Sequence, residues 1–557
     1  MENINLFVMV GAALILFIVF ALLVSGFVLY MVLRKRDTQQ TQHSIRRNFP
    51  VLSHIRYISE HIGPELRQYL FEGDHEAKPF SRLDFQFIVK AGKYAKTIIA
   101  FGSKRDFDKP GFYIRNAFFA KQITDLEADN NKLIDTQKYV TDKDTLFARH
   151  EHSVEAQIKP WHYTDRDAVV MGKDTCRIPY KIKSPVGMSG MSYGALGDHA
   201  ITALSYGLKD AGAYMNTGEG GISPYHLKGG ADIIAQIGPA KFGFRNEDGS
   251  FSYEELRKKA AIPQVKAFEL KLGQGAKIRG GHVEAAKVTP EIAEIRGVEP
   301  YKTIDSPNRF EEFHDMKTMM DFIEKIREVS GKPVGIKIVI GSEDTFEEFA
   351  GFMAKTNRYP DFITIDGGEG GTGATYQAMA DSVGLPIKPA LMIAQRVLKK
   401  YKMRDKVTII ASGKLFSPDK IAIALALGAD VIQIARGLMI SVGCIGAQKC
   451  HSNECPVGVA TTDPKLQKAL VIEEKRYRVT NYMTTLREEL FMLSAAAGLT
   501  SPRQFNEKHV VYVDSEFQAK SIAQVKEVEK VKELVNVKVV EKVVEAEKEK
   551  EKELQLV

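Results

Sequence analysis

Residues 407–437, VTIIASGKLFSPDKIAIALALGADVIQIARG, contain a short apolar run that ends in glycine, then a helical pattern, then a second such run. Continuous apolar runs that alternate with helical patterns are typical of parallel strands that are buried on both faces. The same alternation of apolar runs and helical patterns begins near residue 178 in this chain of 557 residues. It indicates an α/β fold built on a parallel sheet.

Seven apolar runs of this kind are the candidate strands. They are SPVGMSG (184–190), AYMNTG (213–218), FELKLG (268–273), PVGIKIVI (333–340), FITIDG (362–367), VTIIASG (407–413) and VIQIARG (431–437). Seven recognisable strands favour a (βα)8 TIM barrel in which one strand is missed, and an open doubly wound sheet is the alternative.

Two of these runs end in nearly identical glycine-rich loops, NTGEGG at 216–221 and DGGEGG at 366–371. The catalytic groups of a barrel lie at the carboxyl ends of its strands. Glycines at these ends let the backbone approach a flat ring or a phosphate and present its N–H groups as donors. Tight turns without a ligand are the alternative interpretation.

The last two runs end in SGK and ARG. The loops after the seventh and eighth strands of a barrel commonly bind phosphate. The backbone amides of Gly413 and Gly437, with the side chains of Lys414 and Arg436, would supply the donors. For each side chain taken alone, a solvated surface cation is the alternative.

A third group of charged residues surrounds the end of the run FELKLG. Lys271, Gln274 and Lys277, with Arg296 further along, would pair with a substrate that carries two carboxylates, and solvated surface lysines are the alternative. Lys337 lies inside the apolar run GIKIVI. Because a buried charge is costly without a partner, we expect Lys337 to point into a site.

Three of the four cysteines, Cys444, Cys450 and Cys455, fall within twelve positions and are followed by a proline, whereas Cys176 is far away in the sequence. Three thiolates on one loop are suited to a metal centre, and their spacing favours an iron–sulfur cluster that lacks one iron. A zinc site with His451 as the fourth ligand is the alternative. A disulfide framework is less consistent with an odd cysteine set in a cysteine-poor chain.

An uncharged run of 28 residues at 6–33 is long enough for a helix that crosses a bilayer. No basic segment precedes it, which argues against a signal peptide. Five basic residues between 34 and 47 follow it, so the positive-inside rule predicts a single-pass cell-membrane protein whose catalytic domain is cytoplasmic. The net charge of +7 is diffuse and favours no nucleic-acid role.

The changes in composition predict four regions. They are a transmembrane anchor at 1–36, a juxtamembrane linker and helical accessory region at 37–177, the barrel with its cysteine loop at 178–500, and a C-terminal extension at 501–557. The accessory stretch 61–150 is expected to form short helices and loops. The Lys/Glu/Val-rich tail from Lys520 is expected to be disordered, with a weak coiled coil as the alternative.

The segments SPVGMSGMSYGAL, NTGEGG, KLGQGAK, DGGEGGTGA and CIGAQKCHSNECPVGVAT occur together and in this order. On these motifs, residues 180–500 resemble the FMN-binding synthase domain of the glutamate synthase family, and the whole chain resembles its short, membrane-anchored members. The resemblance implies a (βα)8 barrel with FMN and a 3Fe-4S cluster. It also implies reduction of 2-iminoglutarate, formed from 2-oxoglutarate and ammonia, to L-glutamate.

The resemblance also implies roles for individual residues. Cluster ligands would be Cys444, Cys450 and Cys455; residues around 2-oxoglutarate would be Glu219, Lys271, Gln274, Lys277 and Arg296; and residues that bind FMN would be Gly190, Met191, Ser192, Lys337, Asp366, Gly367, Gly413, Lys414, Arg436 and Gly437. Lys337 would lie near the pyrimidine edge of the flavin, where a positive charge stabilises the reduced anion. Glu219 would act as a general acid/base on the substrate nitrogen.

The sequence lacks three parts of the long glutamate synthases: the glutamine-hydrolysing domain, the C-terminal β-helix and an NADPH-binding domain. We therefore expect nitrogen from free ammonia or a separate amidotransferase, and electrons from a ferredoxin or a reductase subunit. Two alternatives remain open. One is a membrane-anchored barrel flavoenzyme that acts on a different substrate, such as a quinone or an amino-acid derivative. The other is a non-catalytic redox or assembly protein.

Overall fold

The computed structural model describes residues 2–95, 98–99, 101–145, 148–278 and 280–522. The tail that is predicted to be disordered lies almost wholly outside these described residues. By its internal contacts the chain divides into two units, Met1–Leu83 and Asp84–Val557. The second unit contains all the residues predicted to bind cofactors, metal or substrate.

Within the described part of the chain, eight strands of the second unit form one sheet whose paired neighbours are all parallel. They are β8 (Val186–Met188), β9 (Tyr214–Asn216), β10 (Asp232–Ile237), β11 (Val265–Lys271), β14 (Val334–Ile338), β15 (Phe362–Asp366), β16 (Thr408–Ser412) and β17 (Val431–Ile434). Their order is β8-β17-β16-β15-β14-β11-β10-β9. Just beyond the edge strands β8 and β9, Met191 N donates to Asn216 O at 3.3 Å, so the sheet curls into a nearly closed barrel.

This arrangement confirms the (βα)8 barrel and excludes the open doubly wound sheet. The seven candidate strands all form, and the missed eighth strand is β10. Its sequence, DIIAQI, is buried almost throughout and is followed by Gly238, so it matches the pattern of the others.

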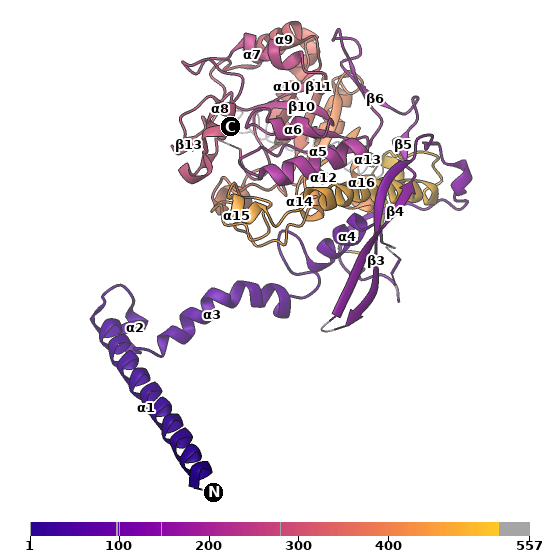
Figure 1. Ribbon diagram of the computed structural model, residues 1–557. Helices are drawn as coiled ribbons and strands as arrows, with labels where there is room; N and C mark the ends of the chain where they lie inside the picture. Colours follow the sequence, from indigo (N-terminus) through magenta and orange to yellow (C-terminus); the bar gives the residue numbers. More distant parts are fainter. Residues whose placement is uncertain (1, 96–97, 100, 146–147, 279, 523–557) are drawn as a thin grey trace, which may run out of the picture. The chain divides into compact units, whose positions relative to one another are not determined.

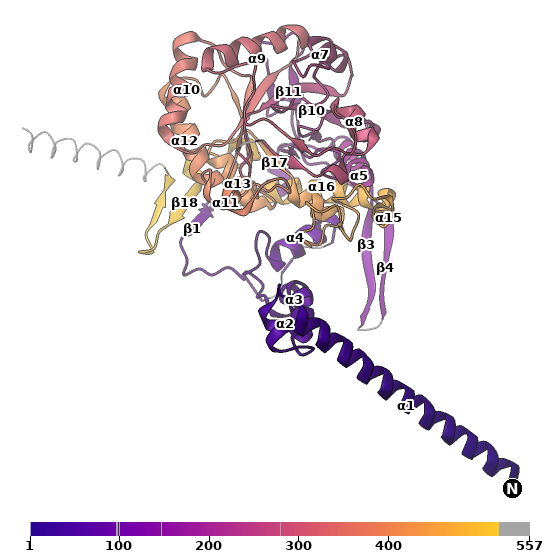
Figure 2. The same cartoon turned by 90° about the vertical axis from the view of Figure 1, so that its left-hand side faces the viewer.

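Helices follow the strands and lie around the outside of the barrel (Figure 1, Figure 2). They are α5 (Asp198–Asp210), α6 (Pro224–Lys228), α7 (Tyr253–Ala260), α9 (Met316–Ser330), α10 (Glu343–Thr356), α12 (Ile387–Lys400), α13 (Pro418–Ala426), α14 (Arg436–Ser441) and α16 (Ile472–Ala496). The long connection between β11 and β14 also carries η3 (Ala285–Lys287) and α8 (Pro290–Arg296).

The amino-terminal end of the barrel is closed by apolar side chains. The hairpin of β6 (Val169–Met171) and β7 (Tyr180–Ile182) packs against inward-facing residues of six strands. These strand residues are Tyr214, Ile234, Ala267, Phe362, Ile410 and Val431. Because side chains alternate along a strand, the residues two positions further along each strand face the same interior, nearer the carboxyl end.

The accessory region differs from the prediction of short helices and loops. After α4 (Arg82–Gly92), the chain forms a long antiparallel hairpin of β3 (Ile134–Thr145) and β4 (Ala148–Ile158), visible beside the barrel in Figure 2. Earlier in the same region, β1 (Gly111–Ile114) pairs with β18 (Val510–Val513) of the C-terminal extension. The hairpin carries polar residues on both faces, so it lacks the alternation that reveals a half-buried strand.

The first unit consists of α1 (Glu2–Gln39), α2 (Ser44–Asn48), α3 (Ser53–Leu66) and the π-helix η1 (Arg67–Phe71). Residues Met9–Gln39 of α1 are long and apolar enough to cross a membrane, and an 18-residue window within them has a mean hydropathy of 3.0 and no buried residue. The beginning of the region 37–177, which was expected to be a juxtamembrane linker, instead forms α2 and the first half of α3.

Candidate active site at the barrel mouth

A polar layer lies above the apolar end of the barrel. Glu269, which is fully buried, accepts hydrogen bonds from Asn216 Nδ2 at 2.8 Å and Gln236 Nε2 at 2.6 Å, and a third from Thr364 Oγ1. Gln433 lies in the same layer beside the hydroxyl of Tyr214, and within the described residues its amide makes no hydrogen bond of normal geometry. The barrel interior therefore becomes polar toward its carboxyl end.

Two lysines share one carboxylate at the mouth. Glu219 Oε1 accepts from Lys271 Nζ at 2.8 Å and from Lys277 Nζ at 2.6 Å. The two lysine side chains are 6% and 5% exposed, and the carboxylate is 20% exposed. The fold thus brings together three parts of the chain. Glu219 lies in the loop after β9, Lys271 lies at the end of β11, and Lys277 lies in the loop after β11.

The charges at the mouth shift the pKa values of this group. Burial lowers the pKa of Lys271 to about 8; the charge of Glu219 opposes this shift, while Lys277 and Lys337 add to it. Burial raises the pKa of Glu219, but the two ammonium groups lower it more, so its net pKa is well below the usual range. One carboxylate therefore faces an excess of positive charge.

Lys337 lies at the end of β14 and is buried. Its Nζ donates to Ser189 Oγ at 3.1 Å and lies 3.8 Å from Asp366 Oδ2. Asp366 also accepts from Gly275 N at 2.9 Å and from Ser412 Oγ. The lysine that interrupts an apolar strand thus has a carboxylate partner at the mouth.

The segment KLGQGAK (271–277) meets the glycine-rich loop at 366–371 across the mouth. Gln274 Oε1 accepts from Lys271 Nζ at 2.5 Å, and Gln274 Nε2 donates to Gly371 O at 3.0 Å. A Cβ on Gly275 would lie only 1.7 Å from Gly367 O, so this close approach requires glycine.

Arg296 and the segment Gly190–Ser192 adjoin the loop after β9. Arg296 is buried in α8, donates to Tyr193 O at 3.1 Å and leaves its Nε without a partner among the described residues. A Cβ on Gly190 would lie 3.1 Å from polar atoms of Asn216 and Gln236, so this glycine borders the polar layer. The backbone of Met191 and Ser192 contacts Gly218.

The predicted phosphate donors are arranged differently from one another. Gly413 adopts a φ of +134°, which requires glycine, and Gly437 is buried at the start of α14. Arg436 donates to Glu369 O, which belongs to the loop at 366–371. Lys414 Nζ instead lies 3.2 Å from Asp84 Oδ2 of α4, so its charge is engaged by a protein carboxylate. A phosphate contact by Lys414 stays a prediction.

The three clustered cysteines lie close enough to affect one another's pKa values. Burial raises the pKa of Cys444 to about 11, the backbone N–H of Gly446 opposes this shift, and the charges of Cys450 and Cys455 add to it. Burial also raises the pKa of Cys450. Lys287 is buried beside them, and its Nζ donates to Cys450 O at 2.5 Å.

The geometry bears on the alternative metal sites. All four cysteines are described, and none forms a disulfide. Among the described residues, the group of three possible metal ligands within 4.8 Å of one another is Asp142, His150 and His152, not the cysteines. Thiolates on a single zinc ion, with Zn–S bonds of about 2.3 Å, would be closer together than that limit.

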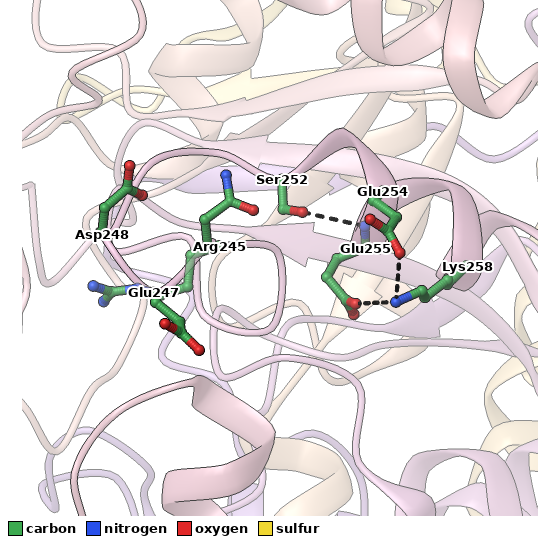
Figure 3. A pocket seen from close by; sticks show the side chains of 8 residues that line it. Arg245, Glu247, Asp248, Ser252, Glu254, Glu255 and Lys258 are labelled. Carbon is green, nitrogen blue, oxygen red and sulfur yellow. Dashed lines mark hydrogen bonds and ion pairs between the residues drawn. The ribbon is translucent and has the colours of Figure 1, made fainter.

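A separate open depression of about 520 Å³ lies beside the start of α7 (Figure 3). Its lining residues are Arg245, Asn246, Glu247, Asp248, Ser252, Glu254, Glu255 and Lys258. Lys258 Nζ lies 2.9 Å from carboxylate oxygens of both Glu254 and Glu255, as Figure 3 shows. None of the predicted site residues lines this depression, so it is distinct from the mouth.

Residues 119–500 match the family described as the conserved region in glutamate synthase. The chain belongs to the glutamate synthase family. It is 56% identical over 501 residues to the glutamate synthase large subunit-like protein YerD of Bacillus subtilis, a match that covers 90% of this chain and 95% of YerD. It is 29% identical over 450 residues to an archaeal-type glutamate synthase (NADPH) of Thermotoga maritima, covering 80% of this chain and 83% of that protein.

The chain also resembles solved structures, at lower sequence identity in the following example. A flavocytochrome b2 mutant with bound pyruvate is 12% identical, covers 81% of this chain and 91% of that chain, and gives a TM-score of 0.40. A score this low carries no argument about function. The barrel assignment rests on the strand order of this member of the glutamate synthase family.

Sequence reasoning missed several residues of this glutamate synthase-family site. Asn216, Gln236 and Glu269 could have been recognised as site residues from the sequence. Each is a polar residue in an otherwise apolar strand, as Lys337 is. Lys287 carried no such signal, since it lies in the connection between β11 and β14 and is 163 positions away from Cys450. Only folding brings this lysine to the cysteine loop.

Proposed function

We propose that this protein is a glutamate synthase-like oxidoreductase that binds FMN and a 3Fe-4S cluster. It reduces 2-iminoglutarate, formed from 2-oxoglutarate and ammonia, to L-glutamate with electrons from a separate donor. The family membership supports the reaction class, and the chemistry of the barrel mouth supports the substrate.

The observation that carries the substrate proposal is the charge imbalance at the mouth. The buried ammonium groups of Lys271 and Lys277 share the single carboxylate of Glu219, and Arg296 is buried nearby with part of its guanidinium unpaired among the described residues. A dicarboxylate such as 2-oxoglutarate would supply the missing negative charge. A neutral substrate would leave the imbalance uncorrected.

The residues present fit FMN. Gly190 and Gly367 let the backbone come close to a flat ring, and Lys337 brings a buried positive charge to the polar layer. Gly413 and Arg436 fit the phosphate end, as the sequence predicts. When bound, FMN supplies a hydride to the imine carbon of the substrate.

The residues present also fit a 3Fe-4S cluster. Cys444, Cys450 and Cys455 supply three thiols on one loop, and the positive charge of Lys287 opposes the rise in the pKa of Cys450. When bound, the cluster supplies single electrons.

The proton for the substrate nitrogen comes from Lys271 rather than from Glu219. The carboxyl of Glu219 is ionised at neutral pH because its pKa is well below the usual range, so it has no proton to give. The ammonium of Lys271, with a pKa of about 8, is a matched acid near neutral pH. Hydride addition to carbon and proton transfer to nitrogen together complete the amine.

The first unit supports attachment to the cell membrane. α1 would cross the bilayer once, and the basic residues after it would hold the barrel in the cytoplasm. The electron donor would be a ferredoxin or a reductase subunit, and nitrogen would come from free ammonia or a separate amidotransferase.

Anaerobic purification followed by flavin and iron analysis tests the cofactors. Glutamate formation from 2-oxoglutarate, ammonium and reduced methyl viologen tests the reaction. Lys271→Met should abolish the change that 2-oxoglutarate causes in the flavin spectrum, whereas Lys258→Met, in the separate depression, should leave it intact. Colourless protein after reconstitution would contradict the proposal. Full FMN loading without glutamate formation would favour a different substrate or a non-catalytic role.

A further inference from the structure

The helix α3 and the π-helix η1 present a continuous apolar face that no other described element of the first unit covers. Their apolar side chains recur at helical spacing and are between 38% and 69% exposed. They are Leu52, Ile55, Ile58, Ile62, Leu66, Tyr69 and Leu70. A stripe of this length is too large to be the scattered apolar residues of an ordinary surface.

The opposite face of α3 is polar. It carries Arg56, Glu60 and His61, and Arg56 Nε lies 2.8 Å from Glu60 Oε1. Between residues 34 and 71 the chain has seven lysines and arginines against three acidic residues. An apolar stripe opposite a polar face, in a segment with excess positive charge, is typical of helices that lie in the interface of an anionic membrane.

The start of α3 is held at the end of α1. Asp37, near the end of α1, is only 2% exposed. It accepts from Val51 N at 2.8 Å, and its Oδ2 lies 3.0 Å from His54 Nε2. The guanidinium of Arg46 also lies 4.4 Å from the centre of the Tyr57 ring. These contacts hold the start of α3 close to the end of α1 (Figure 1). The exposed apolar residues of α3 therefore begin close to the end of the apolar stretch of α1.

We propose that α3 and η1 lie in the membrane interface, with the apolar face toward the acyl chains and the basic residues at anionic headgroups. The continuity with α1 selects a bilayer as the occupant of this face, because a helix end that leaves the bilayer places the next residues at its surface. The inference extends the proposed membrane attachment and is independent of the reaction.

Tryptophan at two positions of the full-length holoenzyme tests the proposal in vesicles of phosphatidylglycerol and phosphatidylcholine. The native Trp161 is the single tryptophan and is buried, so the unsubstituted chain supplies the background. Ile58→Trp places the probe on the apolar face. Glu60→Trp is the matched control, two residues further along and on the opposite, polar face. Lipids brominated in their acyl chains should quench Ile58→Trp at least about twofold more than Glu60→Trp.

Each outcome decides a separate point. Equal quenching of the two variants, or none, would overturn the interfacial placement while leaving the anchor intact if the protein floats with the vesicles. Blue-shifted but unquenched emission from Ile58→Trp would also overturn it, because the face would then be packed against protein. Failure to float with the vesicles would refute the membrane attachment itself. Weaker quenching in vesicles of phosphatidylcholine alone would support the role of the basic residues.

Discussion

Replacing Glu219 with glutamine tests the charge arrangement at the barrel mouth. The substitution keeps the shape of the side chain but removes the negative charge that Lys271 Nζ and Lys277 Nζ approach at 2.8 Å and 2.6 Å. Removing one partner of a buried ion pair typically costs about 3–5 kcal/mol. We expect a loss of this size in the free energy of unfolding at pH 7.

The loss should depend on pH in a defined window. In the native protein the pKa of Lys271 is about 8, against 10.5 for an unperturbed lysine. The folded state then binds fewer protons than the unfolded state as the pH rises through about 8 toward 10.5, so stability rises with pH through this window. Without Glu219 the pKa of Lys271 falls further, and this rise begins at lower pH. Between pH 7 and 8 the penalty should therefore shrink by at most about 1 kcal/mol.

Urea unfolding in detergent, followed by Trp161 fluorescence, measures both quantities. Trp161 is buried against Phe491, with ring centroids 5.7 Å apart, so its emission reports on the second unit. Glu291→Gln is the matched control, because this carboxylate accepts from tyrosine hydroxyls rather than from lysines. A penalty for Glu219→Gln that is the same at pH 7 and pH 8, or smaller than that of the control, would refute the reasoning.

Three further substitutions test other parts of the site. Cys450→Ser should remove most of the iron while leaving the far-UV circular dichroism unchanged, and undiminished iron would exclude it as a ligand. Glu269→Leu leaves three buried donors unpaired and should lower the free energy of unfolding by at least about 3 kcal/mol, measured by urea titration. Gly275→Ala should abolish 2-oxoglutarate binding because its Cβ meets Gly367 O, whereas Gly341→Ala, with open space around it, should not; equal binding by both would contradict the proposed contact.

Much of the fold was predictable because a buried strand can be recognised from its own short stretch of sequence. The buried strands are short apolar runs, and even the missed strand β10 follows the same pattern. The hairpin of β3 and β4 was not predictable, since it is polar on both faces and its sequence has no clear period. The apolar face of α3 was present in the sequence at helical spacing, but the polar residues between its isoleucines gave the stretch the composition of a linker.

The site was predictable to a smaller extent. Its glycines, its cysteines and the charged residues at strand ends stand out by type and position. The partners of these residues do not, because Lys271 and Glu219 are 52 positions apart in the chain. The ion pair between Lys414 and Asp84 was unpredictable for the same reason, since nothing near Lys414 in the sequence indicates a carboxylate on α4.

The barrel, the family and the long apolar helix follow from the order of the residues alone, because each depends on periodicity or motif spacing along the chain. The sharing of charges at the mouth and the approach of Lys287 to the cysteine loop emerge only in the folded molecule. Electrostatic coupling depends on distance through space and on the exclusion of water, and neither quantity can be predicted from the order of the residues alone.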